Sequence, residues 1–139
     1  MSAALAYRWD GRRARLFFHT RPGSYHTETL IGFLAALKRE FRGQTIVVVW
    51  DGLPGHKSRP MQESLRGQRA WLRVERLPGY SPDLNPVEAL WGNGKGQELA
   101  NHCAAQLGEA ASALDRGLGR VRRSRTLPFS FLHHAGLFF

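Results

Sequence analysis

The carboxylate of Asp51 lies where an α/β fold commonly builds a functional site. It directly follows the run TIVVVW at 45–50, a continuous stretch typical of a central strand that helices cover on both faces. The glycine-rich stretch GLPGHKS at 52–58 then predicts a turn that no regular element continues. Because sites in α/β sheets form outside the carboxyl ends of strands, Asp51 is a candidate functional residue.

A second candidate, Glu88, belongs to the stretch LPGYSPDLNPVEALW at 77–91. Prolines restrict the backbone before it, Asn85 is placed to cap a helix, and Pro86 suits the first helical turn. The preceding segment WLRVERL, 71–77, alternates apolar and charged residues, as a strand with one wetter face does. If the strands at 45–50 and 71–77 are parallel, both carboxylates follow strands that end at the same edge, and they can converge.

Two carboxylates held close together repel each other unless one is protonated or a hard cation binds both. Their oxygens favour Mg²⁺ or Mn²⁺, and two such ions can activate an attacking oxygen and stabilise a leaving one in phosphodiester chemistry. An alternative needs no metal: Asp51 caps its own turn, and Glu88 interacts favourably with the positive end of a helix dipole. Spacing alone favours this alternative.

The rest of the sequence predicts one mixed α/β domain over residues 1–139 that positions these carboxylates. Asp10 and Gly11 predict a tight turn in a hairpin, with Asp10 as a turn residue. The expected elements, in chain order, are strands at 2–9 and 13–20, a helix at 27–41, a strand at 45–50, a short helix at 58–65, a strand at 71–77, helices at 86–100 and 108–123, and an apolar tail at 129–139 that docks onto the rest. Helical spacing predicts the apolar face of the first helix from Leu30, Ile31, Leu34, Leu37 and Phe41.

The composition points to a nucleic-acid partner. A formal net charge of +9 favours a polyanion such as DNA or RNA, although a basic solvated surface is the alternative. The single cysteine, Cys103, excludes an internal disulfide and fits a reducing compartment, and as a side chain it is more typical of a small buried hydrophobe. No secretory signal or run of about 20 apolar residues occurs, so we expect a cytoplasmic protein that does not span a membrane.

The two acidic stretches together resemble a known catalytic core. IVVVWDGLPGHKS followed by VERLPGYSPDLNPVEALWGNGK is similar to the DDE-superfamily transposases of bacterial insertion sequences, relatives of the mariner-like elements. In that pattern Asp51 matches the second acid, His56 the histidine and Glu88 the last acid. The direct matches to the second stretch are Tyr80, Ser81, Pro82, Leu84, Asn85, Pro86, Glu88 and Trp91.

The resemblance implies an RNase H-like fold and metal-dependent cleavage and joining of DNA strands at transposon ends. By the same resemblance Asp51 and Glu88 hold two Mg²⁺ or Mn²⁺ ions, and His56 and Lys57 lie near the scissile phosphate. For His56, a hydrogen bond that stabilises the turn is the alternative role. Lys95, two turns after Glu88, can reach DNA or belong to a solvated helix face. Trp91 is expected to pack rather than stack on a base.

The family's first catalytic Asp lies on a strand before the hairpin, and the resemblance places that strand upstream of residue 1. We therefore expect an N-terminally truncated RNase H-like domain, with an upstream transposase polypeptide supplying a helix-turn-helix region and the first Asp. A second copy of the chain is another candidate partner. Two alternatives to an enzyme are a catalytically inactive, sequence-nonspecific DNA-binding remnant of a transposase and a small basic RNA-associated protein.

Overall fold

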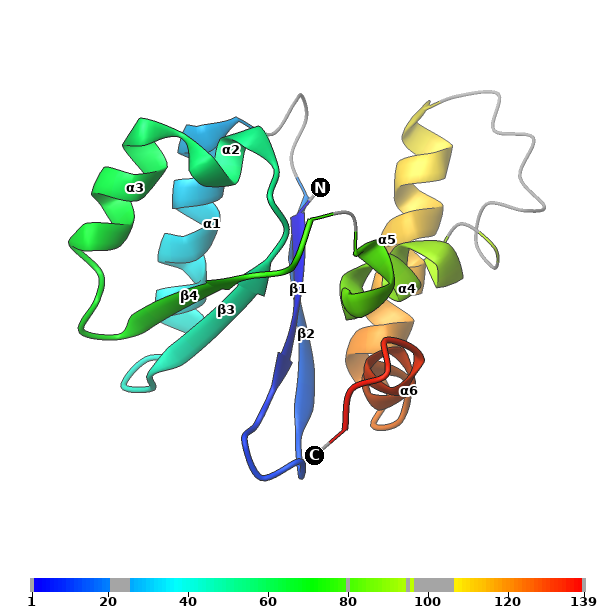
Figure 1. The fold of residues 1–139 in the computed structure, drawn as a ribbon. Coiled ribbons are helices and arrows are strands. Elements are labelled where there is room, and N and C mark those ends of the chain that lie inside the picture. The colour runs from blue at the N-terminus through cyan, green and yellow to red at the C-terminus, as the bar shows by residue number, and fades with distance from the viewer. Residues whose placement is uncertain (1, 21–25, 80, 95, 97–106, 139) are drawn as a thin grey trace. The chain divides into compact units, whose positions relative to one another are not determined.

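The structure, a computed structural model, describes residues 2–20, 26–79, 81–94, 96 and 107–138 (Figure 1). Strands and helices alternate in the first part of the chain, and helices follow in the second. The elements are β1 (Ser2–Tyr7), β2 (Ala14–His19), α1 (Thr27–Glu40), β3 (Ile46–Trp50), α2 (Pro54–Lys57), α3 (Arg59–Arg66), β4 (Leu72–Arg76), the 3-10 helix η1 (Pro82–Leu84), α4 (Pro86–Gly94), α5 (Leu107–Arg123) and α6 (Leu127–His134).

The chain divides into two compact units. The first comprises Met1–Ser2 and His19–Pro82, and the second comprises Ala3–Phe18 and Asp83–Phe139. Strands β3 and β4 form a two-stranded sheet in the first unit, and β1 and β2 form another two-stranded sheet. Asp51 therefore belongs to the first unit and Glu88 to the second.

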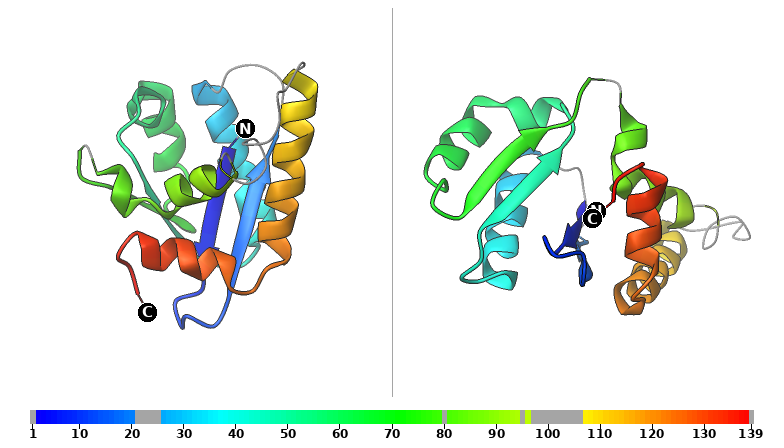
Figure 2. Two further views of the ribbon diagram at one scale, coloured as in Figure 1. Left: turned by 90° about the vertical axis from the view of Figure 1, so that its right-hand side faces the viewer. Right: turned by 60° about the horizontal axis from the view of Figure 1, so that its bottom comes forward.

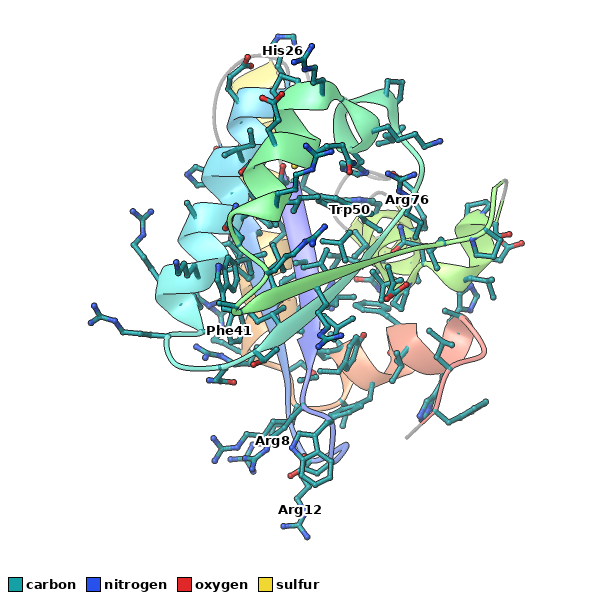
Figure 3. All side chains as sticks on the ribbon, turned by 60° about the vertical axis from the view of Figure 1, so that its left-hand side comes forward. Arg8, Arg12, His26, Phe41, Trp50 and Arg76 are labelled. Atoms are coloured by element: carbon teal, nitrogen blue, oxygen red, sulfur yellow. The ribbon has the colours of Figure 1, made fainter. Side chains whose placement is uncertain are left out.

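The sheet of the first unit is parallel, as the argument from the two acidic stretches requires. Ile46 pairs with Leu72 at one end of the register, and Trp50 pairs with Arg76 at the other. The backbone N–H of Leu77 donates to the carbonyl of Trp50 over 2.9 Å and extends the pairing by one step. Trp50 and Arg76 mark the shared carboxyl edge in Figure 3. The chain leaves the sheet toward Asp51 and toward the proline-rich segment from this one edge.

The faces of β3 differ from the prediction of a central strand covered on both faces. Ile46, Val48 and Trp50 are half-buried, but Val47 and Val49 are 57% and 56% exposed. Within the part of the chain that the structure describes, β3 pairs with β4 in a sheet of two strands. The prediction was wrong because an unbroken apolar run indicates only that both faces of a strand can be buried. It does not show which elements, if any, cover those faces.

Helices α1, α2 and α3 pack on one another in the first unit (Figure 2). Helix α1 confirms the predicted helix, and the predicted Leu34 and Leu37 are buried. Phe33, which was not predicted, is buried as well, whereas Leu30, Ile31 and Phe41 are half-buried. Ser58, the first residue of the short helix predicted at 58–65, caps α3, because its side chain accepts a hydrogen bond from the Met61 N–H over 3.4 Å. The predicted turn at 52–58 was wrong in part, since α2 forms one helical turn within it.

The hairpin of β1 and β2 forms where Asp10 and Gly11 predicted it. Gly11 has a φ of 68°, a conformation that glycine adopts without a steric penalty. Asp10 accepts a hydrogen bond from the Arg12 N–H over 3.0 Å and forms an ion pair with Arg8 at 3.1 Å. Asp10 is thus a turn residue, as expected.

The second unit has its core where α4, α5 and α6 meet. Gly94 allows a close approach, because a Cβ there would lie 2.9 Å from the Leu114 side chain. Buried apolar residues of this core include Leu16, Leu90, Ala113, Leu118, Val121, Phe131 and Leu132. The apolar tail docks as predicted, but part of it is a helix that the sequence analysis missed. Helix α6 ends in a Schellman motif, with Gly136 at a φ of 71° and the Leu137 N–H donating to the Leu132 carbonyl.

Tyr7 joins β1 to α6. Its hydroxyl donates a hydrogen bond to the Pro128 carbonyl over 2.6 Å, and its ring lies 5.9 Å from that of Phe129. Burial raises the pKa of the Tyr7 hydroxyl well above its ordinary value, because the phenolate would lose hydration. The side chain therefore remains a neutral donor at physiological pH. None of the described helices is long and apolar enough to cross a membrane.

Candidate functional site

Asp51 is held in its own turn directly after β3. Its Oδ1 accepts a hydrogen bond from the Leu53 N–H at 3.1 Å and lies 2.9 Å from His56 Nδ1, an ion-pair contact when the imidazole is protonated. The turn-capping role foreseen for Asp51 is therefore present. Its side chain is 41% exposed, and within the described residues Oδ2 has no hydrogen-bond or ion-pair partner. One oxygen is thus fixed by the turn, and the other is available to a ligand.

His56 lies between Trp50 and Asp51. The imidazole stacks on the Trp50 ring with centroids 4.4 Å apart and an interplanar angle of 3°, and its side chain is only 12% exposed. Nδ1 also lies 3.2 Å from the Asp51 carbonyl oxygen. Both neighbours of Nδ1 are acceptors, so this nitrogen must carry a hydrogen. The helical turn α2 brings the ring there, and it corrects the expectation that no regular element follows Asp51.

Lys57 lies over Gly52. A Cβ at position 52 would be 2.8 Å from Lys57 Nζ and 3.1 Å from its Cε, so the absence of a side chain at Gly52 leaves space for the ammonium group. Lys57 is exposed, and the structure describes no ion pair for it. A cation therefore lies beside the loop that carries Asp51.

Glu88 occupies the first turn of α4, as predicted. The Asn85 side chain accepts a hydrogen bond from the Val87 N–H over 3.2 Å, and the Glu88 N–H donates to the Asn85 carbonyl over 2.9 Å. The cap foreseen at Asn85 is confirmed. The Glu88 side chain is exposed, and its carboxylate makes no hydrogen bond or ion pair with any described residue, whereas Trp91 on the same helix is half-buried.

Replacing Asn85 with Ala should lower the free energy of unfolding by about 1 kcal/mol, because the Val87 N–H then loses its capping acceptor. Chemical denaturation followed by circular dichroism measures this difference. Asn85→Ser, which restores a capping oxygen, is the matched control. A Ser variant as unstable as the Ala variant would show that the cap does not carry the effect.

The donor chemistry of the two carboxylates fits a hard divalent cation, since each has an oxygen without a described partner. Each of the two, within its own unit, is a candidate ligand for such a cation. Among the described residues, no group of three or more His, Cys, Asp or Glu side chains gathers in a way that could hold a metal ion. A complete coordination shell would need oxygen ligands from elsewhere as well, including water.

The end of α5 carries exposed arginines in the basic stretch RVRRSR at 120–125, which were not predicted as site residues. Arg122 and Arg123 are exposed, and no described residue forms an ion pair with either. The Arg123 guanidinium lies along the helix, 3.5 Å from where a Cβ on Gly119 would be. In the sequence these arginines are marked by a high density of positive charge. A solvated helix end has the same feature, so the charge density does not by itself indicate a site.

Several residues of the sequence analysis lie outside the described part of the chain. Lys95, predicted to reach DNA, is among them, as are Cys103 and the Tyr80 of the proline-rich segment. Residues 97–100 of the predicted helix at 86–100 are outside it too, and the described helix α4 ends at Gly94.

Solved structures share this fold. The catalytic domain of Mos1 mariner transposase matches with a TM-score of 0.56 and 16% identity, over 99% of this chain and 81% of that one. A second structure, of the Mos1 catalytic domain and raltegravir with Mg, matches with a TM-score of 0.51 and 16% identity, over 99% of this chain and 83% of that one. These likenesses confirm the expected RNase H-like α/β fold of a transposase catalytic domain.

The Mos1 strand transfer complex also matches, with a TM-score of 0.51 and 21% identity, over 94% of this chain. The chain spans 42% of the length of the transposase in that complex. A comparison with curated proteins finds no match. The model of the DDE superfamily endonucleases matches residues 9–109, a range that includes Asp51, His56 and Glu88. The chain belongs to the DDE superfamily endonuclease family.

Proposed function

We propose that this chain takes part in transposase-type cleavage and joining of DNA strands, with Asp51 and Glu88 as ligands of Mg²⁺ or Mn²⁺. The observation that carries the proposal is the parallel register of β3 and β4, which brings their carboxyl ends to one edge of a sheet. Asp51 follows one strand there, and the segment leading to Glu88 follows the other. Two of the similar structures, a strand transfer complex and a catalytic domain with Mg, support the same activity and cation.

Each residue of the site has a distinct role in this proposal. Asp51 and Glu88 each offer an exposed carboxylate oxygen to the cations, which when bound would activate the attacking oxygen and stabilise the leaving one. Lys57, exposed beside the Asp51 loop, attracts the phosphate of the DNA strand, and Lys95 contacts DNA farther along the chain after Glu88. A DNA contact by His56 would use Nε2, since Nδ1 is bound to Asp51.

We further propose that another polypeptide supplies a third carboxylate. The support is membership of the DDE superfamily endonucleases together with the resemblance described above, in which the first catalytic Asp lies on a strand before the hairpin. An upstream transposase polypeptide is the proposed donor, and it would also bring the helix-turn-helix region. The experiment is Mn²⁺-dependent nicking of terminal-repeat DNA by the folded chain alone and with that polypeptide. Cleavage only in the mixture is expected, and no cleavage in either sample would contradict the proposal.

A second candidate function is sequence-nonspecific DNA binding without catalysis. It is favoured by the exposed arginines at the end of α5 and by the Oδ1 bonds that make Asp51 a turn residue. Binding that ignores divalent cations, together with no nicking under any condition, would favour this candidate over the enzyme.

The arginines of α5 should contribute to DNA affinity through phosphate contacts. In an Arg122→Gln and Arg123→Gln double variant, the slope of log K against log salt should become shallower by about 2, roughly one for each lost contact. Fluorescence anisotropy with duplex DNA over a range of KCl concentrations measures the slope.

The matched control is a double variant in which Arg8 and Arg59 are replaced with Gln, so that it loses the same number of positive charges. In the parent chain Arg8 forms an ion pair with Asp10 at 3.1 Å, and Arg59 forms one with Glu63 at 2.9 Å. Paired arginines release fewer counterions from DNA, so this control should change the slope less. An equal change in both variants would mean that net charge matters and the α5 position does not.

A further inference from the structure

The His56 side chain contacts the Asp51 carboxylate, and the Trp50 ring packs against His56. The Trp50 ring, at the end of β3, stacks on the imidazole at 4.4 Å. Nδ1 of the imidazole lies 2.9 Å from Asp51 Oδ1 and forms a hydrogen bond of 3.2 Å with the Asp51 carbonyl oxygen. Rotation of the carboxylate would lose both the contact with His56 and the hydrogen bond from the Leu53 N–H to Oδ1, so Oδ2 is the oxygen left for a ligand.

The imidazole is itself fixed by the surrounding loop and helices. The His56 N–H donates to the Leu53 carbonyl over 3.0 Å within α2, and Ser58 Oγ donates to the Gly55 carbonyl over 3.1 Å. Ser58 Oγ also shares a hydrogen bond of 3.0 Å with Thr27 Oγ1 at the start of α1. The loop that carries the imidazole is therefore tied to α1 and α3, and stacking on Trp50 orients the ring plane.

We infer that His56 is a positioning residue, which holds Asp51 through Nδ1–H so that Oδ2 is presented to a divalent cation. This inference rests on the proposed function for the cation and assigns to His56 a role through Asp51 in place of a direct DNA contact. A hydrogen bond to a ligating carboxylate fixes its orientation, and loss of such partners typically costs about 10- to 100-fold in metal affinity.

The test uses three variants of the full chain that separate stacking from hydrogen bonding. His56→Phe keeps an aromatic ring stacked on Trp50 but removes the N–H donor. His56→Asn keeps an amide N–H donor near the place of Nδ1. His134→Phe, at an exposed histidine of α6, is the matched control. Isothermal titration with Mn²⁺ alone measures the affinity, and circular dichroism checks the fold. We expect His56→Phe to bind Mn²⁺ about 10-fold more weakly, and His56→Asn and His134→Phe to bind within about threefold of the parent.

A second measurement needs no metal. ¹⁵N chemical shifts of the imidazole show which nitrogen carries hydrogen, and we expect hydrogen on His56 Nδ1 in the parent chain. In Asp51→Ala the backbone carbonyl of residue 51 remains as an acceptor, so hydrogen should stay on Nδ1, while its chemical shift should change because the carboxylate contact is lost. An imidazole with hydrogen on Nε2 alone in the parent chain would overturn the inference.

The outcomes separate the inference from the proposed function. Mn²⁺ binding that disappears in Asp51→Ala but is unchanged in folded His56→Phe would overturn the inference and leave the metal site standing. Failure of the parent chain to bind Mn²⁺, with hydrogen found on His56 Nδ1, would instead contradict the proposed metal site, while His56 would still be shown to hold Asp51.

Discussion

An Asp51→Asn variant should lose about a thousandfold in the rate of Mn²⁺-dependent DNA nicking, which corresponds to about 4 kcal/mol in activation free energy. The asparagine keeps an Oδ1 that can accept the hydrogen bonds from the Leu53 N–H and from His56. What it removes is the negative charge that a cation requires. The turn should therefore survive while metal binding and cleavage fail.

The measurement is single-turnover nicking of terminal-repeat DNA by the chain combined with the upstream polypeptide, with circular dichroism to verify folding. Asp83→Asn is the matched control, because Asp83 is an exposed carboxylate in η1, in the same segment as Glu88. Glu88→Gln should be as inactive as Asp51→Asn, and the double variant should be little worse than either single one, since the two residues act as a unit. Full activity in Asp51→Asn would contradict the assignment of the site.

Replacing Leu90 with Ala should lower the free energy of unfolding by about 2 to 5 kcal/mol, the usual cost of truncating a fully buried leucine. Leu90 is 1% exposed and lies on α4, two residues after Glu88. Its loss leaves a cavity in the core of the second unit, because a packed interior closes only partly around a missing side chain.

Urea denaturation measured by circular dichroism gives the stability of the Leu90 variant. Leu84→Ala is the control in the same segment, because Leu84 is 40% exposed and its truncation removes much less buried surface. We expect that control to cost less than about 1 kcal/mol. Equal losses in the two variants would mean that α4 is not anchored through Leu90.

Local features of the sequence predicted local structure well. Ser58 caps α3 and Asn85 caps α4 as expected, because a short polar side chain reaches the free N–H groups of the turn that follows it. Asp10 and Gly11 form the hairpin turn for a similarly local reason. The parallel pairing of β3 and β4 was a condition of the argument from the two carboxylates and is met; helices between the two strands suit such a crossover connection.

Features that depend on distant partners were predicted less well. Phe33 rather than Ile31 is buried on α1, and helix α6 forms in a tail whose apolar residues follow no clear period. The exposure of Val47 and Val49 could not be read from their strand, since a run of valines does not say which elements will cover it. In each case the neighbours in space, and not those in sequence, decide burial.

In the candidate site, too, the local features could be predicted from the sequence and the long-range contacts could not. The sequence by itself determined the family, the positions of Asp51 and Glu88, and the local caps around them, because these depend on residue type and short spacing. Only the tertiary structure decided that His56 stacks on Trp50 and binds Asp51 Oδ1, leaving Oδ2 free, because the directions of side chains after a turn depend on how the turn packs against its neighbours.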